Sequence, residues 1–528
     1  MFHRMRTVVL VSFVIALLSL PLAGQTQQKN AREDPGWRIE PENINIQVEN
    51  DRTLQLLDDS AQELHDAVWS VDDPALATIR EEDGRAVLHA TAVGTVIVNA
   101  SWHGEIRTRE IKIWSAIRPL PGGTTNYSTH DFGGRSIGIL PAVPTADGPN
   151  LYSVDEFPNG SIYLLAMRED GIQVWSWLLP EATHNVELIC GDWLGGALIS
   201  ANRDDSYTLY AVGKDGELRW QRTMKGARKG LADSTDHLVH VVNQSTDGNN
   251  VTVIGIGEDT GTKYFELAVP VSHEKQINLR REGTKISCAN GTVSNPMHAM
   301  ASRIMVNMDG NAYLAFTQRE WALTTAECTP GQAIDPKDVT LTRDDKLVLW
   351  KIDPDGSYST VVVEETKAKQ PLSVPATLVS PTNAIITDNM NGTLISVRQS
   401  HNVAFSSGNE PADEFVYRVN QNGELVFKFP LPKYSGPLKD DMISGDDNVA
   451  FATRGRFLIA FSLISGKELW RWESTEPEIS VFVSIANGGC MVQTPTVVVA
   501  VNSSTKAKTV FNGKAMMDWY GHLYRKVD

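Results

Sequence analysis

The sequence predicts an all-β protein with two domains, a small antiparallel β-sandwich followed by a β-propeller. First, a sequence motif recurs, which we call the phrase: an apolar strand, a Gly-centred turn and a second strand that often ends on Trp. Two copies are "YTLYAVGKDGELRWQRT" (207–223) and "FLIAFSLISGKELWRWE" (457–473). Second, the turn glycines follow at intervals of 45, 45, 95, 67 and 43 residues, and a period of roughly 40–50 residues with several strands per repeat is typical of a propeller. Third, residues 36–115 alternate apolar and polar side chains in short runs, which favours half-buried strands.

The first 24 residues have the layout of a secretory signal peptide. Arg4 and Arg6 precede an apolar run from Val8 to Leu20, and the small residues Ala23 and Gly24 follow. The run is too short to span a bilayer comfortably, although an uncleaved membrane anchor is the alternative. No cysteine follows the run, so a lipid anchor is not expected. After a polar linker (25–35) we therefore expect an exported protein, periplasmic or secreted, without a membrane span.

Composition excludes some partners. The chain has 528 residues, 41% of them hydrophobic and 21% charged, which is typical of a globular protein of more than one domain. Its formal net charge is −16 and no block of basic residues occurs. Because nucleic acid binding requires a clustered positive surface, a nucleic acid partner is not expected. We expect a monomer.

Six short strand-like runs lie between residues 36 and 115: "INIQV", "TLQLL", "AVWSV", "AVLHATA", "TVIVNASW" and "REIKIW". This segment resembles the group 2 bacterial immunoglobulin-like domain, and the residues that match the family pattern are Trp69, Ser70, Asp73, Pro74, Ala77, Thr78, Gly94 and Thr95. The resemblance implies an immunoglobulin-like sandwich that acts as a spacer or an adhesive module.

Residues 116–528 carry the repeats. The turn glycines are Gly171, Gly216, Gly261, Gly356, Gly423 and Gly466. Each phrase is predicted to supply the two outer strands of a blade, since Asp-Gly and Asn-Gly allow the positive φ angles of tight hairpins. With two further strands upstream of each phrase, seven blades begin near Ser136, Val186, Leu231, Ala301, Ala376, Asp441 and Val481. The tail "DWYGHLYRK" could close the ring, so eight blades stay open as the alternative.

Tryptophans near the ends of the repeats have an expected structural role. A large flat side chain on the outer strand can fill the space that widens between blades, so Trp175, Trp220 and Trp470 are predicted to pack between blades. The phrase resembles the pyrroloquinoline-quinone-like propeller repeat, with Leu209, Tyr210, Ala211 and Trp220 matching in one copy and Ala460, Gly466, Leu469 and Trp470 in another.

The resemblance does not imply a quinone cofactor here. Quinone-dependent dehydrogenases of that family carry adjacent cysteines, whereas none of the four cysteines in this chain is adjacent to another. No Cys-x-x-Cys-His haem motif is present either. A second branch, the propeller lipoprotein of the outer-membrane β-barrel assembly machinery, carries a lipid-bearing cysteine that this chain lacks. We expect no cofactor.

Three further motifs have structural interpretations. "GRSIG" (134–138) matches a hydrolase nucleophile pattern but precedes a strand rather than a helix. His237 and His240 are three residues apart on a predicted strand and would face opposite sides, so they cannot share one metal ion. "DPDG" (353–356) is half of a Ca²⁺ loop and sits where other copies have a turn. We therefore expect no catalytic and no metal-binding residues.

Insertions give the functional hint. Residues 319–345 in the fourth unit and 398–414 in the fifth separate the second blade strand from the third. Both are expected to be long loops on one propeller face, where loops on a rigid scaffold commonly carry recognition. The sequence favours a non-enzymatic binding or scaffold protein of the bacterial cell envelope whose propeller face recognises a protein or glycan. The alternative is an enzyme, either a degenerate quinoprotein dehydrogenase or a carbohydrate-active propeller with funnel carboxylates.

The four cysteines are expected to form one disulfide. Cys190 and Cys490 fall in units separated by another blade and are predicted to be free. Cys288 precedes the fourth unit and Cys328 lies in its insertion, on the same expected face. Since export favours disulfides, a Cys288–Cys328 bond is predicted to fasten the insertion to the rim.

Overall fold

The protein is seen here in a computed structural model. It describes residues 36–526, except for the following: 41–44, 49–50, 59, 61, 83–84, 116, 119–123, 128–134, 144–147, 169, 181–184, 235, 308–309, 327, 389–391, 403–412, 434–440, 446–447, 486–487, 503–506, 514 and 518–522. The predicted signal peptide (1–24) and linker (25–35) lie outside the described residues. Within the described part of the chain, no helical segment has the length and apolar character needed to traverse a bilayer.

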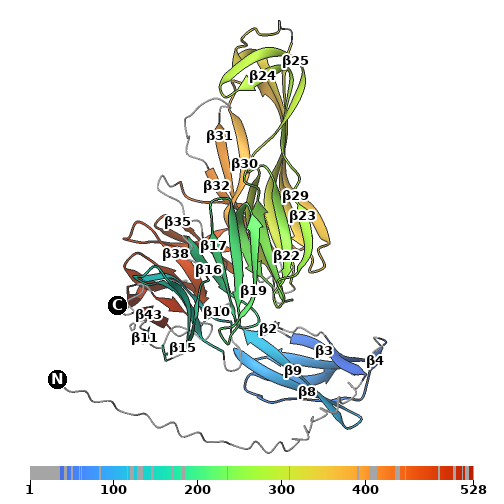
Figure 1. Cartoon of the computed structure of the whole chain (residues 1–528), viewed down its shortest axis with the longest axis vertical. Helices are drawn as coiled ribbons and strands as arrows, with labels where there is room; N and C mark the ends of the chain where they lie inside the picture. The colour runs from blue at the N-terminus through green and yellow to red at the C-terminus, as the bar shows by residue number, and fades with distance from the viewer. Residues whose placement is uncertain are drawn as a thin grey trace, which may run out of the picture.

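Two sheets face each other between residues 37 and 114 (Figure 1). One sheet consists of β1 (Trp37–Glu40), β3 (Asp51–Asp58), β4 (Glu63–Leu64), β6 (Ala77–Glu82) and β7 (Arg85–Ala90). The other consists of β2 (Asn45–Gln47), β5 (Val68–Val71), β8 (Gly94–Trp102) and β9 (Glu105–Trp114). Leu54, Leu88, Val96 and Ile111 are fully buried between them. Alternation of apolar and polar residues thus places one face of each sheet in a shared core.

The remaining strands form a ring of antiparallel sheets, in which four successive strands make one blade. The first blade consists of β12 (Arg135–Pro141), β13 (Leu151–Glu156), β14 (Ile162–Met167) and β15 (Gln173–Leu178). The second consists of β16 (Val186–Gly191), β17 (Ala197–Asn202), β18 (Ser206–Val212) and β19 (Leu218–Lys225). The third consists of β20 (Ala227–Asp233), β21 (Leu238–Gln244), β22 (Val251–Gly257) and β23 (Lys263–Ala268). The fourth blade consists of β26 (Met300–Val306), β27 (Ala312–Thr325), β28 (Val339–Ile352) and β29 (Tyr358–Pro371), with a short 3₁₀ turn at Pro336–Asp338. The fifth consists of β30 (Ala376–Thr387), β31 (Thr393–Asn402), β32 (Asp413–Val419) and β33 (Leu425–Pro430).

The sixth and seventh blades are β34 (Met442–Ser444), β35 (Val449–Arg454), β36 (Phe457–Ser462) and β37 (Glu468–Glu473); and β38 (Ser480–Ile485), β39 (Gly489–Gln493), β40 (Val497–Val501) and β41 (Ala507–Asn512). Strand β10 (Ile117–Arg118) pairs in parallel with β38. A small eighth sheet combines both ends of the ring: β11 (Thr124–Tyr127) pairs in parallel with β43 (Leu523–Lys526), and β43 pairs with β42 (Met516–Met517).

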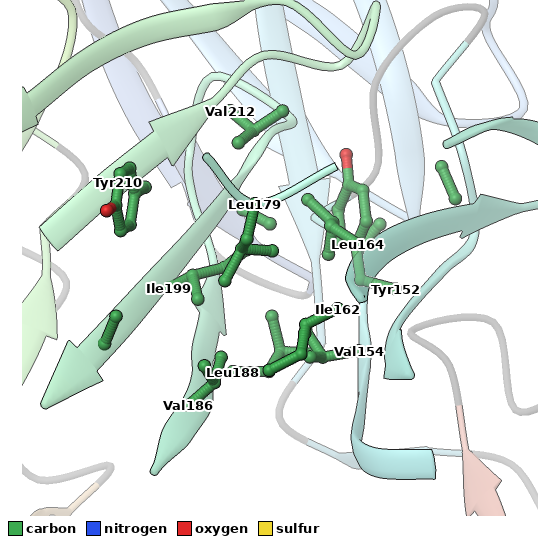
Figure 2. Packing of buried hydrophobic residues seen from close by; sticks show 14 residues of the cluster. Tyr152, Val154, Ile162, Leu164, Leu179, Val186, Leu188, Ile199, Tyr210 and Val212 are labelled. Atoms are coloured by element: carbon green, nitrogen blue, oxygen red, sulfur yellow. The ribbon is translucent and has the colours of Figure 1, made fainter. Parts of the chain in front are cut away.

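Buried clusters connect each sheet to the next and close the circle. Figure 2 shows the first contact, where Val154, Ile162 and Leu164 of the first blade face side chains of the second. Comparable clusters join the other successive sheets. Tyr524 of the eighth sheet packs against Leu151 and Met167 of the first blade, which completes the ring. The predicted all-β propeller is confirmed: the seven units expected from the sequence are four-stranded, and a smaller eighth sheet containing the predicted tail strand closes the ring.

The recurring phrase positions neighbouring blades against each other. Gly216 lies in the outer hairpin turn of the second blade with φ of 85°, and a Cβ added there would lie 2.8 Å from the ring of Trp175 in the first blade. A Cβ added at Gly261 would likewise meet the side chain of Trp220. The corresponding pairs at the later blade contacts are Gly356 with Phe265, Gly423 with Val361 and Gly466 with Phe427. The turn therefore needs glycine for its backbone conformation and for the bulky side chain that lies over it.

The remaining phrase residues also have structural places. Trp470 is buried between the sixth and seventh blades. Gly171 occupies the hairpin turn of the first blade with φ of 78°.

Candidate functional site

A sheet projects from the fourth blade, at the opposite end of the molecule from the sandwich (Figure 1). Two strands of the connection before that blade, β24 (His273–Glu282) and β25 (Lys285–Pro296), form a hairpin. Strand β24 then pairs in parallel with the far half of β27, so that the order is β25-β24-β27-β28-β29. We call β24, β25 and the parts of β27, β28 and β29 that extend beyond the ring (319–325, 339–345 and 366–371) the projecting sheet.

The expectation of a long loop at residues 319–345 is wrong. Strands β27 and β28 stay paired from Ala312–Ile352 through Thr325–Val339, and only 326–338 lies between them. The reason is visible in the alternation of buried and exposed residues: Trp321, Leu323 and Leu341 point to one face and pack together with Leu279 and Ile286. The insertion therefore has its own apolar core, which a loop would lack.

The loop after β27 returns to the edge of β25. Ser287 and Ala333 form a bridge, and the backbone N–H of Cys288 donates a 2.8 Å hydrogen bond to the carbonyl of Gln332. Cys288 and Cys328 are joined in a disulfide with Cα atoms 5.7 Å apart, while Cys190 and Cys490 are free. The bond thus ties this loop to the hairpin within the projecting sheet.

Buried charges fasten the base of the projecting sheet to the fifth blade. The Arg343 guanidinium donates to the carbonyl of Thr377 at 2.7 Å and to Asp345 at 3.2 Å. Trp321 donates its indole N–H to the other oxygen of Asp345 at 2.7 Å. Arg319 donates to the Ser380 hydroxyl at 2.8 Å. Because leaving one partner of such a buried pair alone is costly, this network holds the projecting sheet in one orientation.

The outer face of the projecting sheet is open to solvent and rich in charge. A shallow cavity of about 510 Å³ lies over it and is lined by Lys275, Glu320, Ala322, Thr342, Asp344, Lys367 and Lys369 among others. The lining comes from β24, β27, β28 and β29. The first three of these strands pack on the core behind them, and β29 is held by its pairing with β28. The geometry is that of a preformed surface for polar recognition.

A second cluster lies where the sandwich meets the ring. Lys112 of β9 donates a short hydrogen bond to the carbonyl of Trp193, in the turn after β16. Asp192 accepts a hydrogen bond from Arg219. Asp233 accepts from the Trp193 N–H at 2.9 Å, and Glu258 accepts from the Leu194 N–H at 2.9 Å. We call Lys112, Asp192, Arg219, Asp233, His237 and Glu258 the junction cluster.

Burial dominates the electrostatics of the junction cluster. Desolvation, then the negative charge of Glu258, raises the pKa of Asp192 to about 8, and the same two causes raise the pKa of Asp233. Desolvation also lowers the pKa of Lys112. Asp192 and Glu258 are fully buried. They accept hydrogen bonds from backbone N–H groups, Arg219 and His237, and Glu258 is also hydrogen-bonded to the carboxyl groups of Asp192 and Asp233. These contacts give the cluster a structural role at the junction.

The histidine and turn motifs have separate places. The His237 ring contacts Glu258 at 2.7 Å, whereas His240 is buried beside Phe265. Gly356 lies in a hairpin turn, as the glycines of the other copies do, and its N–H donates to the backbone carbonyl of Asp353. Among the described residues no group of three or more His, Cys, Asp or Glu side chains has an arrangement suited to a metal ion. Gly134 of "GRSIG" lies outside the described residues, and Ile137 and Gly138 belong to β12.

In the fifth unit the insertion is partly described. Strand β31 continues to Asn402 and β32 begins at Asp413, so 398–402 and 413–414 are strand rather than loop, and 403–412 lie outside the described residues. Sequence reasoning singled out the insertion of the fourth unit but missed Lys275 and Lys369. The alternation in "REWALTT" and "VTLTRDD" is the signal that predicts strands there.

The chain has similarity to solved structures at low sequence identity. No known protein family matches the sequence. No curated protein matches it either. Among solved structures, BamB from Moraxella catarrhalis is 12% identical, covering 73% of this chain and 92% of that one with a TM-score of 0.36.

Two further solved structures match at a similar level of identity. A catalytically inactive virginiamycin B lyase from Staphylococcus aureus with quinupristin is 11% identical over 69% of this chain and 93% of its own, TM-score 0.36. A quinohemoprotein alcohol dehydrogenase from Pseudomonas putida is 12% identical over 73% and 74%, TM-score 0.29. The ring closed by a buried cluster at each blade contact identifies the part of the chain after the sandwich as a β-propeller of the all-β class.

Proposed function

We propose that this protein is an exported, non-enzymatic binding or scaffold protein, and that the projecting sheet is its recognition surface for a protein partner. The observation that carries the proposal is the projecting sheet itself: a preformed, solvent-facing surface fixed by its own core, by a disulfide and by a buried ionic network. Rigid mounting lowers the entropy lost on binding. Four short strands are enough for a blade, so the ring can close without the part of the projecting sheet that lies beyond its contacts with the fifth blade.

The spacing of carboxylates on the innermost strands favours a binding role over glycoside hydrolysis. In the innermost strands of the seven four-stranded blades, the carboxylates are Glu187 of β16 and Asp233 of β20. Glu187 pairs with Arg228, and Asp233 belongs to the junction cluster. Arg228, the partner of Glu187, and Asp233 are five residues apart along β20, so the strand positions at which the two carboxylates lie are separated by about 16 Å. Glycosidases hold their carboxylates within about 10 Å.

A trimmed variant tests the proposal. Replacing 319–345 by a two-residue turn and 271–298 by a short flexible connection keeps β26 to β29 of the fourth blade as a four-stranded sheet. The full chain and the trimmed chain are then expressed in the producing bacterium, cross-linked, and purified. We expect a protein partner with the full chain and its loss with the trimmed chain, at unchanged thermal stability of the ring. A partner retained by a folded trimmed chain contradicts the proposal.

A further inference from the structure

One cross-strand row of the projecting sheet ends in a lysine on each side. Lys275 of β24 is paired with Ala322 of β27, Ala322 with Thr342 of β28, and Thr342 with Lys369 of β29. Residues in register across a sheet point to the same face. Lys275, Thr342 and Lys369 are exposed and Ala322 is half-buried. We call these four residues the lysine trough.

The two lysines of the trough are not neutralised. In the adjacent row Lys367 lies 2.9 Å from Glu365 and 3.8 Å from Asp344, and His273 lies 3.7 Å from Glu320. By contrast, among the described residues neither Lys275 nor Lys369 has a carboxylate within ion-pair distance. The trough thus carries two free positive charges on a chain whose net charge is −16.

The dimensions suit a single extended chain. Lys275 and Lys369 are three strand spacings apart, which separates their Cα atoms by about 14 Å. Between them Ala322 and Thr342 form a low floor under the cavity of about 510 Å³. Lysine side chains that lean inward from both walls can reach carboxylates of a chain lying along the strands.

We propose that the lysine trough binds an extended acidic segment of the partner protein, with carboxylates of that segment held between Lys275 and Lys369. The proposal rests on the proposed function and names the chemistry of the partner. Charge complementarity selects an anionic ligand. A sugar polymer is disfavoured because sugar rings bind best against exposed aromatic faces. Trp321 also borders the cavity, but its side chain packs in the core of the projecting sheet, is only 8% exposed and donates to Asp345.

Fluorescence anisotropy with a labelled octapeptide of alternating Glu and Thr tests the inference on the full mature chain. Alternation places every Glu on one side of the extended peptide. We expect saturable binding that weakens at least tenfold between 50 and 300 mM NaCl. The double variant Lys275→Gln/Lys369→Gln should weaken binding at least tenfold, and Ala322→Trp should block it by filling the floor.

The matched control is Lys263→Gln/Lys351→Gln, which removes the same charge from two lysines outside the trough that have carboxylate neighbours, Lys263 on β23 and Lys351 near the far end of β28 from Thr342. It should change the affinity less than twofold. Equal loss in the control, no binding of the peptide, or binding of polygalacturonate in place of the peptide each overturns the inference. If the peptide fails while the partner still requires the projecting sheet in the trimming experiment, the inference fails and the proposed function stands.

Discussion

The indole N–H of Trp175 donates a 2.7 Å hydrogen bond to the carbonyl of Lys214, so that a side chain of the first blade covers the hairpin turn of the second. Trp220 makes the corresponding bond to the carbonyl of Glu258, also at 2.7 Å, across the next blade contact. Each bond joins a side chain on an outermost strand to a turn whose glycine leaves room for it. The repeated phrase is therefore a device for joining blades at their outer edge.

Substituting the covered glycine should destabilise the ring more than strain alone predicts. Gly216→Ala introduces a Cβ at φ of 85° and 2.8 Å from Trp175. We expect a loss of about 2–4 kcal/mol in the free energy of unfolding, from left-handed strain plus overpacking. Gly104→Ala is the matched control, because Gly104 also has φ of 85° but a Cβ added there would have nothing within 4 Å. It should lose only about 1–2 kcal/mol.

Urea unfolding of the two variants and of Gly216→Ala/Trp175→Ala measures the difference. The double variant should lose less than the sum of its two single changes, because removing the indole relieves the clash. Strictly additive losses would show that Trp175 and Gly216 do not interact.

Non-reducing peptide mapping checks the disulfide. Peptides containing Cys288 and Cys328 should be recovered linked, and Cys190 and Cys490 should react with an alkylating reagent only after unfolding. The last point follows because desolvation raises the pKa of both free thiols, of which Cys490 is fully buried and Cys190 half-buried, and so suppresses the reactive thiolate. Recovery of Cys288 and Cys328 as alkylated thiols from the native protein would contradict the pairing.

Cys328→Ser should loosen the projecting sheet without opening the ring. The closed loop spans 40 residues, for which the chain-entropy account gives a stabilisation of about 4 kcal/mol. Hydrogen exchange should accelerate in Lys285–Pro296 and stay unchanged in β16–β19. Acceleration throughout the ring would show that the bond supports the whole propeller.

The junction cluster makes stability fall as pH rises. Burial raises the pKa of Asp192 to about 8, whereas in the unfolded chain it lies near 4. Between these values the folded state holds a proton that the unfolded state has released. The contribution is therefore fully present below about pH 4 and is lost as pH rises through about 8, with a slope of at most about 1.4 kcal/mol per pH unit for one proton.

Comparison with Asp192→Asn isolates this effect, since all other titrating groups are shared. From pH 5 to pH 8 the variant should lose less stability than the parent protein in urea unfolding. Parallel pH profiles of the two proteins would refute the assignment.

Much of the fold could be predicted from the sequence because it depends on local periodicity. Turn glycines such as Gly216 and tryptophans such as Trp220 mark strand ends directly, and the repeat multiplies the signal. The eighth sheet is harder to predict, because β11 and β43 come from distant parts of the chain and each has four residues. Such pairing depends on ring closure and not on local pattern.

The projecting sheet could not be predicted from the local sequence pattern alone. The length of residues 319–345 exceeds that of a turn and so predicts a loop, yet Trp321 and Leu341 alternate with polar residues in strand fashion. Their core is completed by Leu279 and Ile286 from a hairpin before the blade, which no local pattern couples to them. The lysine trough arises from that same non-local pairing, so Lys275 and Lys369 are brought into one row only in the folded sheet.

Site-specific photo-cross-linking in the native host tests whether the projecting sheet contacts the protein partner. A photoreactive phenylalanine analogue is placed at Thr342, on the outer face of the projecting sheet, and separately at Gln221, an exposed position on the outermost strand of the second blade. We expect a discrete cross-linked protein from position 342 and none from position 221. Cross-links from position 221 alone, or none from position 342 while the partner still co-purifies with the full chain, would contradict this expectation.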